Sequence, residues 1–155
     1  MHGEPDLVTH ASFAFRFLKR FKEHLERRSS YKRFQKSQAY WSLWSTGPYT
    51  FSPYKVLWKE MSGGRFVAAY VGSFDDPVLG KRLVIPDHKL YFVPMSTEEE
   101  AAFLTGLLNA PTVAHAISSY AAQLSLGVSV VEYLEIPEWD PSDAQQVKVS
   151  KLAKA

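Results

Sequence analysis

The chain has 155 residues, of which 46% are hydrophobic and 22% charged, as expected for one globular domain rather than a disordered chain. It has no cysteine, which excludes disulfides and cysteine zinc sites. No apolar run approaches the roughly 20 residues that cross a bilayer, so we expect a cytoplasmic protein without a membrane partner. The net charge of +2 is uneven, because residues 1–60 hold 11 Lys/Arg against 5 Asp/Glu and residues 61–155 hold 7 against 11. The basic half favours a polyanionic partner.

The first part of the chain is predicted to be a flexible lead-in over residues 1–12, followed by one basic helix over 13–28. Ser12 is the expected N-cap of that helix. Apolar side chains fall at helical spacing and predict one buried stripe: Ala14, Phe17, Leu18, Phe21 and Leu25. Residues 29–44, SSYKRFQKSQAYWSLW, are basic with interspersed aromatic residues and predict a loop leading into a short strand near 40–45.

The middle of the chain is rich in β-forming residues and predicts strands at 54–60, 65–72, 81–86 and 89–94. In the first of these, period-two alternation places Tyr54, Val56 and Trp58 on one face and Lys55 and Lys59 on the other. Turns are expected at 62–64, in a loop over 74–80, and at Asp87–His88. Three residues are assigned to the core: Trp58, Phe66 and Leu104.

The last third of the chain is mainly helical. Ser96 and Glu99 form a capping-box pattern before a helix that ends at Asn109. A second helix is predicted over 111–126, a strand over 128–137, and a terminal helix capped by Ser142. Together these elements predict a single α+β domain over 1–155, with a mainly antiparallel central sheet flanked by an N-terminal basic helix and a C-terminal helical pair.

The sequence contains few groups for catalysis. It has no dinucleotide-binding or P-loop glycine pattern, and its five histidines do not occur at H-x-x-x-H spacing. The consecutive acids at 98–100 point in different directions on a helix, so they predict a favourable helix start rather than a metal site. A small free-standing enzyme using Asp87–His88 remains an alternative. The favoured interpretation has no catalytic residue, metal or cofactor in this chain, and Asp87–His88 holds a turn.

The candidate site is a surface of cations and aromatic residues, because Lys and Arg neutralise phosphates and rings stack on bases. The residues expected to contact phosphates are Lys55, Lys59, Arg65, Lys32, Arg33 and Lys36. Tyr49, Thr50 and Ser52 lie in a predicted turn that can approach base edges. For Tyr49 and Phe51, packing in the core is an equally weighted alternative.

Three segments, in this order, carry a resemblance to a known family. They are YTFSPYKVLWKE (49–60), DHKLYFVP (87–94) followed by an acidic-start helix ending LLNAP, and LEIPEWDP (134–141). Residues 40–141 resemble the C-terminal region of adenine-specific, S-adenosylmethionine-dependent DNA methyltransferases of restriction-modification and phage-defence systems, including fused type IIG proteins.

The resemblance implies a target-recognition domain that grips duplex DNA, beside a separate domain that binds S-adenosylmethionine and carries an Asn/Asp-Pro-Pro-Tyr/Phe motif. That motif and a glycine-rich donor loop do not occur in this sequence. The implied protein is therefore a fragment of a larger methyltransferase and not an enzyme by itself. Its implied partners are duplex DNA and the catalytic methyltransferase domain. The alternative is a protein-interaction module, in which the helix at 13–28 docks onto a partner subunit or the missing catalytic core.

Overall fold

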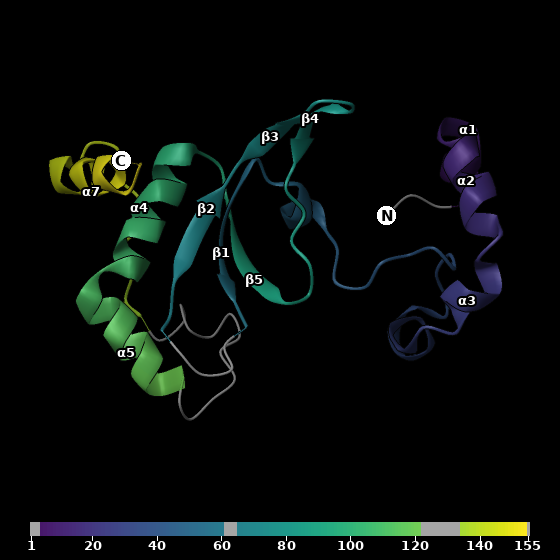
Figure 1. The fold of residues 1–155 in the computed structure, drawn as a ribbon, viewed down its shortest axis with the longest axis horizontal. Coiled ribbons are helices and arrows are strands. Elements are labelled where there is room, and N and C mark those ends of the chain that lie inside the picture. Colours follow the sequence, from purple (N-terminus) through teal and green to yellow (C-terminus); the bar gives the residue numbers. More distant parts are fainter. Residues whose placement is uncertain (1–3, 61–64, 122–133, 155) are drawn as a thin grey trace. The chain divides into compact units, whose positions relative to one another are not determined.

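The computed structural model describes residues 4–60, 65–121 and 134–154, and the chain divides into two units, Met1–Pro48 and Tyr49–Ala155 (Figure 1). The sequence predicts one domain over this length. Helices and antiparallel sheets are both present, which confirms the predicted α+β class. Among the helices described, none combines the length and the apolar character needed to span a membrane.

The first unit consists of short helices instead of one long helix. Its elements are α1 (Glu4–His10), α2 (Ser12–Lys19), α3 (Lys22–Glu26) and a π-helical turn, η1 (Tyr31–Gln35). The prediction of a flexible lead-in over 1–12 is wrong where α1 forms. The predicted N-cap is also wrong, because Ala11 precedes α2 and Ser12 is already its first residue.

The predicted apolar stripe of the first helix is wrong as well. In these two fully described helices, α2 and α3, no residue is buried. Ala14, Phe17 and Phe21 are exposed, and Leu18 and Leu25 are half-buried. Helical spacing places apolar residues on one side of a helix, but they are buried only where a second layer packs against that side.

The second unit is built on a three-stranded antiparallel sheet with the strand order β2–β1–β5. The strands are β1 (Tyr54–Lys59), β2 (Ala68–Val71) and β5 (Leu90–Met95), and a short 3-10 helix, η2 (Pro48–Phe51), leads into β1. Val56 lies opposite Tyr70 in β2 and Val93 in β5. Val56 and Trp58 are fully buried, which confirms the face that the alternation predicts for them.

The helices described beside this sheet are α4 (Glu98–Asn109), α5 (Pro111–Ala121) and α7 (Ala144–Lys154). Helix α4 lies against one face of the sheet, with α7 beside it (Figure 1). The core between them includes Trp58, Phe66 and Leu104, as predicted. Residues 134–137 form no strand, and the rest of the strand predicted at 128–137 lies outside the described residues, as do the turn at 62–64 and the helix beyond 121.

The strands β3 (Ser73–Asp76) and β4 (Gly80–Leu83) form a separate two-stranded antiparallel ribbon. The Asp76 carboxylate accepts hydrogen bonds from the backbone N–H groups of Val78 (2.8 Å) and Leu79 (2.7 Å), and Gly80 adopts a left-handed φ of 69°. The loop predicted at 74–80 is therefore partly a strand. The segment predicted at 81–86 pairs back onto it instead of joining the central sheet.

Two helix caps lie one residue later than predicted. The Thr97 hydroxyl accepts a hydrogen bond from the Glu100 N–H (3.2 Å), and the Glu100 carboxylate accepts one from the Ser96 N–H (3.1 Å). Asp143 caps α7 by accepting from the N–H of the second and third following residues, whereas Ser142 bonds to a preceding carboxylate. Because Glu100 takes the capping position, the Glu99 side chain does not cap the helix.

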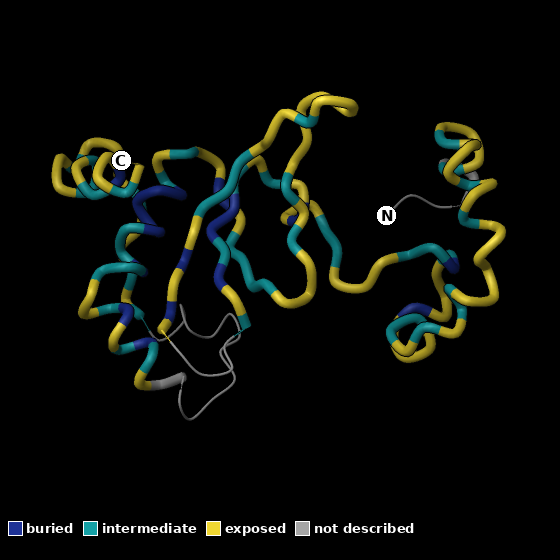
Figure 2. The backbone as a smooth tube through the Cα atoms, viewed as in Figure 1, coloured by how far each residue is buried: buried dark blue, intermediate teal, exposed yellow. Residues whose placement is uncertain are grey.

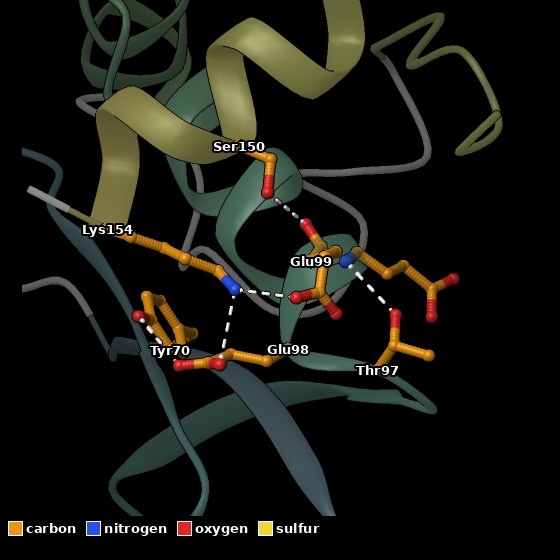
Figure 3. Close-up of polar contacts among 7 residues, drawn as sticks. Tyr70, Thr97, Glu98, Glu99, Ser150 and Lys154 are labelled. Carbon is orange, nitrogen blue, oxygen red and sulfur yellow. Dashed lines mark hydrogen bonds and ion pairs between the residues drawn. The ribbon is translucent and has the colours of Figure 1, made fainter. Parts of the chain in front are cut away.

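Helix α7 is fastened to the start of α4 by polar contacts (Figure 3). The Lys154 amine donates to Glu99 (2.8 Å) and Glu98 (3.2 Å), and the Ser150 hydroxyl donates to the Glu99 carbonyl (2.8 Å). Further along α4, a Cβ added at Gly106 would meet the Val149 side chain at 2.9 Å. The glycine therefore permits the close approach of the two helices.

Candidate nucleic-acid interface

Lys55 and Lys59 both lie on the face of β1 opposite Val56, but their environments differ. Lys55 is 1% exposed. Its amine donates to the Ser52 carbonyl (2.9 Å) and lies 5.9 Å from the centre of the Phe92 ring, and burial lowers the pKa of Lys55. Lys59 is exposed at the end of the strand. Lys55 therefore lies on the predicted face of β1, but it is buried there, with its amine against the Ser52 carbonyl and the Phe92 ring.

In the turn that was predicted to contact bases, two of the three residues are buried or bonded to the protein's own backbone. Thr50 is buried. Ser52 is half-buried and donates its hydroxyl to the Tyr54 carbonyl (3.0 Å). Tyr49 is partly exposed, and its ring lies 6.0 Å from that of Phe92. Phe51 is exposed, so the alternative of core packing is wrong for this residue.

Lys59 and Arg65 lie at the same end of the sheet. Strands β1 and β2 run antiparallel with Trp58 opposite Ala68, so the end of β1 and the approach to β2 meet there. Arg65 is exposed like Lys59, although it precedes β2 and is not part of it. Near them Lys89 pairs with Glu60 (3.3 Å), which leaves this end of the sheet only mildly basic.

Lys32, Arg33 and Lys36 are exposed on or next to η1, as the sequence predicts for a basic surface. Among the residues that the structure describes, no carboxylate lies within ion-pair distance of these three side chains. The sequence explains this, since it has no acidic residue between Glu26 and Glu60. Their positive charges are therefore not neutralised locally.

The segment that carries these cations is held by partly buried hydrogen bonds. The Arg28 guanidinium donates to the carbonyls of Leu25 (2.9 Å), Tyr40 (2.8 Å) and Ser42 (2.9 Å). The buried Gln35 amide donates to the Ser42 hydroxyl (2.9 Å). Residues 40–45 form turns, so the strand predicted there is wrong, because Arg28 binds carbonyls that a strand would need for its ladder.

Beside these contacts, Phe34 and Trp44 form a ring pair that the sequence did not predict. Their ring centroids are 4.1 Å apart and their planes differ by 22°, yet Phe34 is 54% and Trp44 53% exposed. Phe34 lies within two residues of all three exposed cations of η1. We call Lys32, Arg33, Phe34, Lys36 and Trp44 the basic–aromatic surface. The absence of acids around KRFQK was the sequence signal for it.

The described residues offer little for catalysis. They contain no cluster of three or more potential metal ligands. The Asp87 carboxylate accepts from the backbone N–H of His88 (2.6 Å) and lies 2.7 Å from its ring Nδ1, and these contacts lower the pKa of Asp87. Both side chains are exposed, on the turn before β5. This geometry agrees with a turn-holding pair.

No protein-family model, curated protein or solved structure matches this chain.

Proposed function

We propose that this chain is the DNA-binding target-recognition module of a DNA adenine methyltransferase of the restriction-modification type. In this role it holds duplex DNA while a separate catalytic domain flips and methylates the target base. The observation that supports DNA binding is the basic–aromatic surface, where exposed cations lie in a segment without acidic residues. The resemblance of residues 40–141 supports the class of parent protein.

The residues proposed to contact phosphates are Lys32, Arg33 and Lys36 in the first unit, with Lys59 and Arg65 in the second. All five are exposed. Lys55 does not belong to this set, because its side chain is buried and its amine binds the Ser52 carbonyl. Tyr49 keeps an exposed ring that can reach a base edge, whereas Thr50 is buried and Ser52 bonds its own backbone.

This module contributes binding and no chemical step. Phosphate contacts fix the register and orientation of a duplex. Flipping a base costs a few kcal/mol of lost stacking, and additional contacts to the backbone offset this cost. The methyl donor, S-adenosylmethionine, belongs to the catalytic domain of the parent protein.

The test is a salt titration of duplex DNA binding by the full chain and by two variants with equal losses of charge. One replaces Lys32, Arg33 and Lys36 with Ala, and the control replaces Lys81, Lys148 and Lys151, which are also exposed. Each phosphate contact contributes about −0.9 to the slope of log affinity against log salt. The first variant should flatten the slope by about 2.7 if all three cations make contacts, and the control should change it little. Absence of duplex binding, or equal effects of the two variants, contradicts the proposal.

A second candidate function is supported by a row of exposed rings on α2 and the turn after it. Phe13, Phe17 and Phe21 are spaced four residues apart and are exposed, and the rings of Phe17 and Phe21 lie 5.2 Å apart. Residues at this spacing lie on one side of a helix. Such a row favours docking onto a partner subunit or the catalytic domain.

The docking function makes a separate prediction. Replacing Phe13 and Phe17 with Ser should weaken binding to the catalytic domain of the proposed parent methyltransferase, as measured by calorimetry. The salt slope of DNA binding should stay the same, because neither ring neutralises a phosphate. Unchanged affinity for the core would exclude this row as the docking site.

A further inference from the structure

We infer that the Phe34–Trp44 pair is a stacking site for unpaired bases, so that the basic–aromatic surface binds DNA that is at least locally single-stranded. This inference rests on the proposed function and deepens it, because base flipping leaves a locally unpaired stretch in the duplex that the same surface holds. Duplex DNA keeps its base faces stacked and hidden, whereas an unpaired base offers its face to a ring.

The first observation is the exposure of the two rings. Figure 2 shows that the described part of the first unit is mostly exposed or intermediate. A Phe and a Trp that pack on each other and still leave more than half of each surface in water form an apolar patch. Patches of this kind mark binding sites more often than single exposed residues do.

The second observation is the geometry of the pair. At 4.1 Å between centroids and 22° between planes, the two rings are stacked, and each turns one face toward the other. A planar base can extend this stack by lying on an outward face. Stacking is also tolerant of sequence, because every base has a flat π-face.

The third observation is that the pair is held in place before any ligand arrives. Arg28 binds the carbonyls of Tyr40 and Ser42, and Gln35 binds the Ser42 hydroxyl, so both arms that carry the rings are tied together. Gln35 is buried while its neighbour Phe34 is exposed. A preformed site loses less conformational entropy on binding than a flexible one.

The positive charge beside the Phe34–Trp44 pair indicates which kind of ligand binds there. Lys32, Arg33 and Lys36 surround Phe34 in sequence and have no carboxylate within ion-pair distance among the described residues. An apolar protein partner would need acids to neutralise three cations at the edge of its interface. A nucleic-acid strand brings a phosphate with every base, so it supplies both the stacking face and the opposite charge.

The test compares binding of the full chain to an oligothymidylate of about 16 nucleotides and to an abasic strand of the same length. The two strands carry the same phosphates, so the ratio of their affinities reports the contribution of the bases. The oligothymidylate should bind tighter by roughly 5- to 150-fold for each stacked base. Trp44 fluorescence should be quenched by the oligothymidylate and not by the abasic strand.

The variants separate stacking from folding. Phe34→Ala and Trp44→Ala should bring the affinity ratio close to one, whereas Trp44→Phe should keep most of the ratio and lose the quenching. Phe74→Ala is the control, because Phe74 is a similarly exposed ring on β3. Circular dichroism checks that each variant is folded, and the Trp44→Phe result stands even where an alanine variant unfolds.

Each outcome decides between the two proposals. A wild-type ratio near one, or a ratio that survives Phe34→Ala and Trp44→Ala in folded protein, overturns the stacking site. If duplex binding still shows the expected salt slope, only this inference fails. If the chain binds neither duplex nor either single strand, the proposed DNA-binding function fails as well.

Discussion

The two units place the same kinds of residue in opposite environments. In the second unit, Trp58 and Phe66 are each 1% exposed because the sheet and α4 form two packed layers. In the first unit, Phe34 and Trp44 remain more than half exposed on a segment held by polar contacts to Arg28 and Gln35. An aromatic-rich sequence therefore indicates a core only where a second layer exists to cover the rings.

The same contrast holds for the cations. Each unit has 9 Lys/Arg, but Met1–Pro48 has 4 Asp/Glu and Tyr49–Ala155 has 12. In the second unit Lys89 and Lys154 pair with glutamates, whereas in the described part of the first unit the ion pair is Lys22 with Glu26, at 3.9 Å. Equal numbers of cations thus leave the first unit with a net charge of +5 (9 minus 4) and the second with −3 (9 minus 12).

The largest expected difference between the units comes from removing one indole from each. Trp58→Ala should lower the free energy of unfolding by about 3–5 kcal/mol, because it leaves a cavity in the core. Trp44→Ala should change it by less than about 0.5 kcal/mol, because its ring is half in water. Urea unfolding followed by circular dichroism measures both. Similar losses for the two variants would show that Trp44 also supports a core.

The next effect concerns the contact between α4 and the sheet. The Asn109 side chain accepts from the Ala68 N–H (2.9 Å) and donates to the Ala68 carbonyl (2.8 Å). Asn109→Ala leaves both buried backbone groups without partners, at about 1–3 kcal/mol each. Ser119→Ala, which removes an exposed hydrogen bond to His115, is the control and should cost less than about 0.5 kcal/mol. Equal losses of unfolding free energy for the two variants would contradict the conclusion that Asn109 holds α4 to β2 through Ala68.

The third prediction compares the two lysines of β1. Lys55→Met keeps the volume and removes a charge whose burial is unfavourable, so stability at neutral pH should rise, by less than about 1.5 kcal/mol. The pKa of Lys55 is lowered in the folded state, so wild-type stability should increase as the pH rises from that value toward the usual 10.5. Lys55→Met should lose this increase. Unfolding midpoints measured across that range test it.

For DNA binding we expect the opposite order: replacing Lys59 should have an effect, and replacing Lys55 should have none. Lys59→Met should flatten the salt slope by about 0.9, the value for one phosphate contact, and Lys55→Met should leave it unchanged. A flattened slope for Lys55→Met would mean that its amine leaves the Ser52 carbonyl to reach DNA.

The smallest effect concerns the fastening of α7. The hydrogen bond from Lys154 lowers the pKa of Glu99, and the bond to Glu99 raises the pKa of Lys154. Their mutual stabilisation is therefore complete between the usual values of 4.5 and 10.5. It is lost as the pH falls through the lowered pKa of Glu99 or rises through the raised pKa of Lys154.

Lys154→Ala should accordingly speed amide hydrogen exchange in α7 slightly at neutral pH. The difference from wild type should shrink in acid. Lys151→Ala, an exposed lysine on the same helix, is the control and should leave the exchange rates as they are. A Lys154→Ala effect that is constant with pH would show that Lys154 holds the helix through packing of its side chain and not through its charge.

Local patterns predicted much of the second unit. The alternation in residues 54–60 identified the buried face of Val56 and Trp58, and the acidic start of α4 lies within one residue of its predicted cap. Period two assigns a side chain to a face, but it does not tell what covers that face. The burial of Lys55 by Ser52 and Phe92 was therefore not predictable from the strand itself.

The errors arose where distant residues decide the structure. The pairing of β4 with β3 depends on the turn that Asp76 stabilises, which composition alone did not distinguish from a loop. The cations of the basic–aromatic surface were chosen from the sequence, because the charge of a segment is a local property. The stacking of Phe34 on Trp44 was not, since it depends on Arg28 binding carbonyls twelve and fourteen residues away.

The contact between Asn109 and Ala68 also affects how the protein meets other copies of itself. Strand β2 is an edge strand of its sheet, and edge strands with free N–H and C=O groups can pair with strands from neighbouring molecules. The Asn109 amide occupies both groups of Ala68 in the way that another strand would. We therefore expect position 109 to guard against self-assembly in concentrated solution as well as to stabilise the fold.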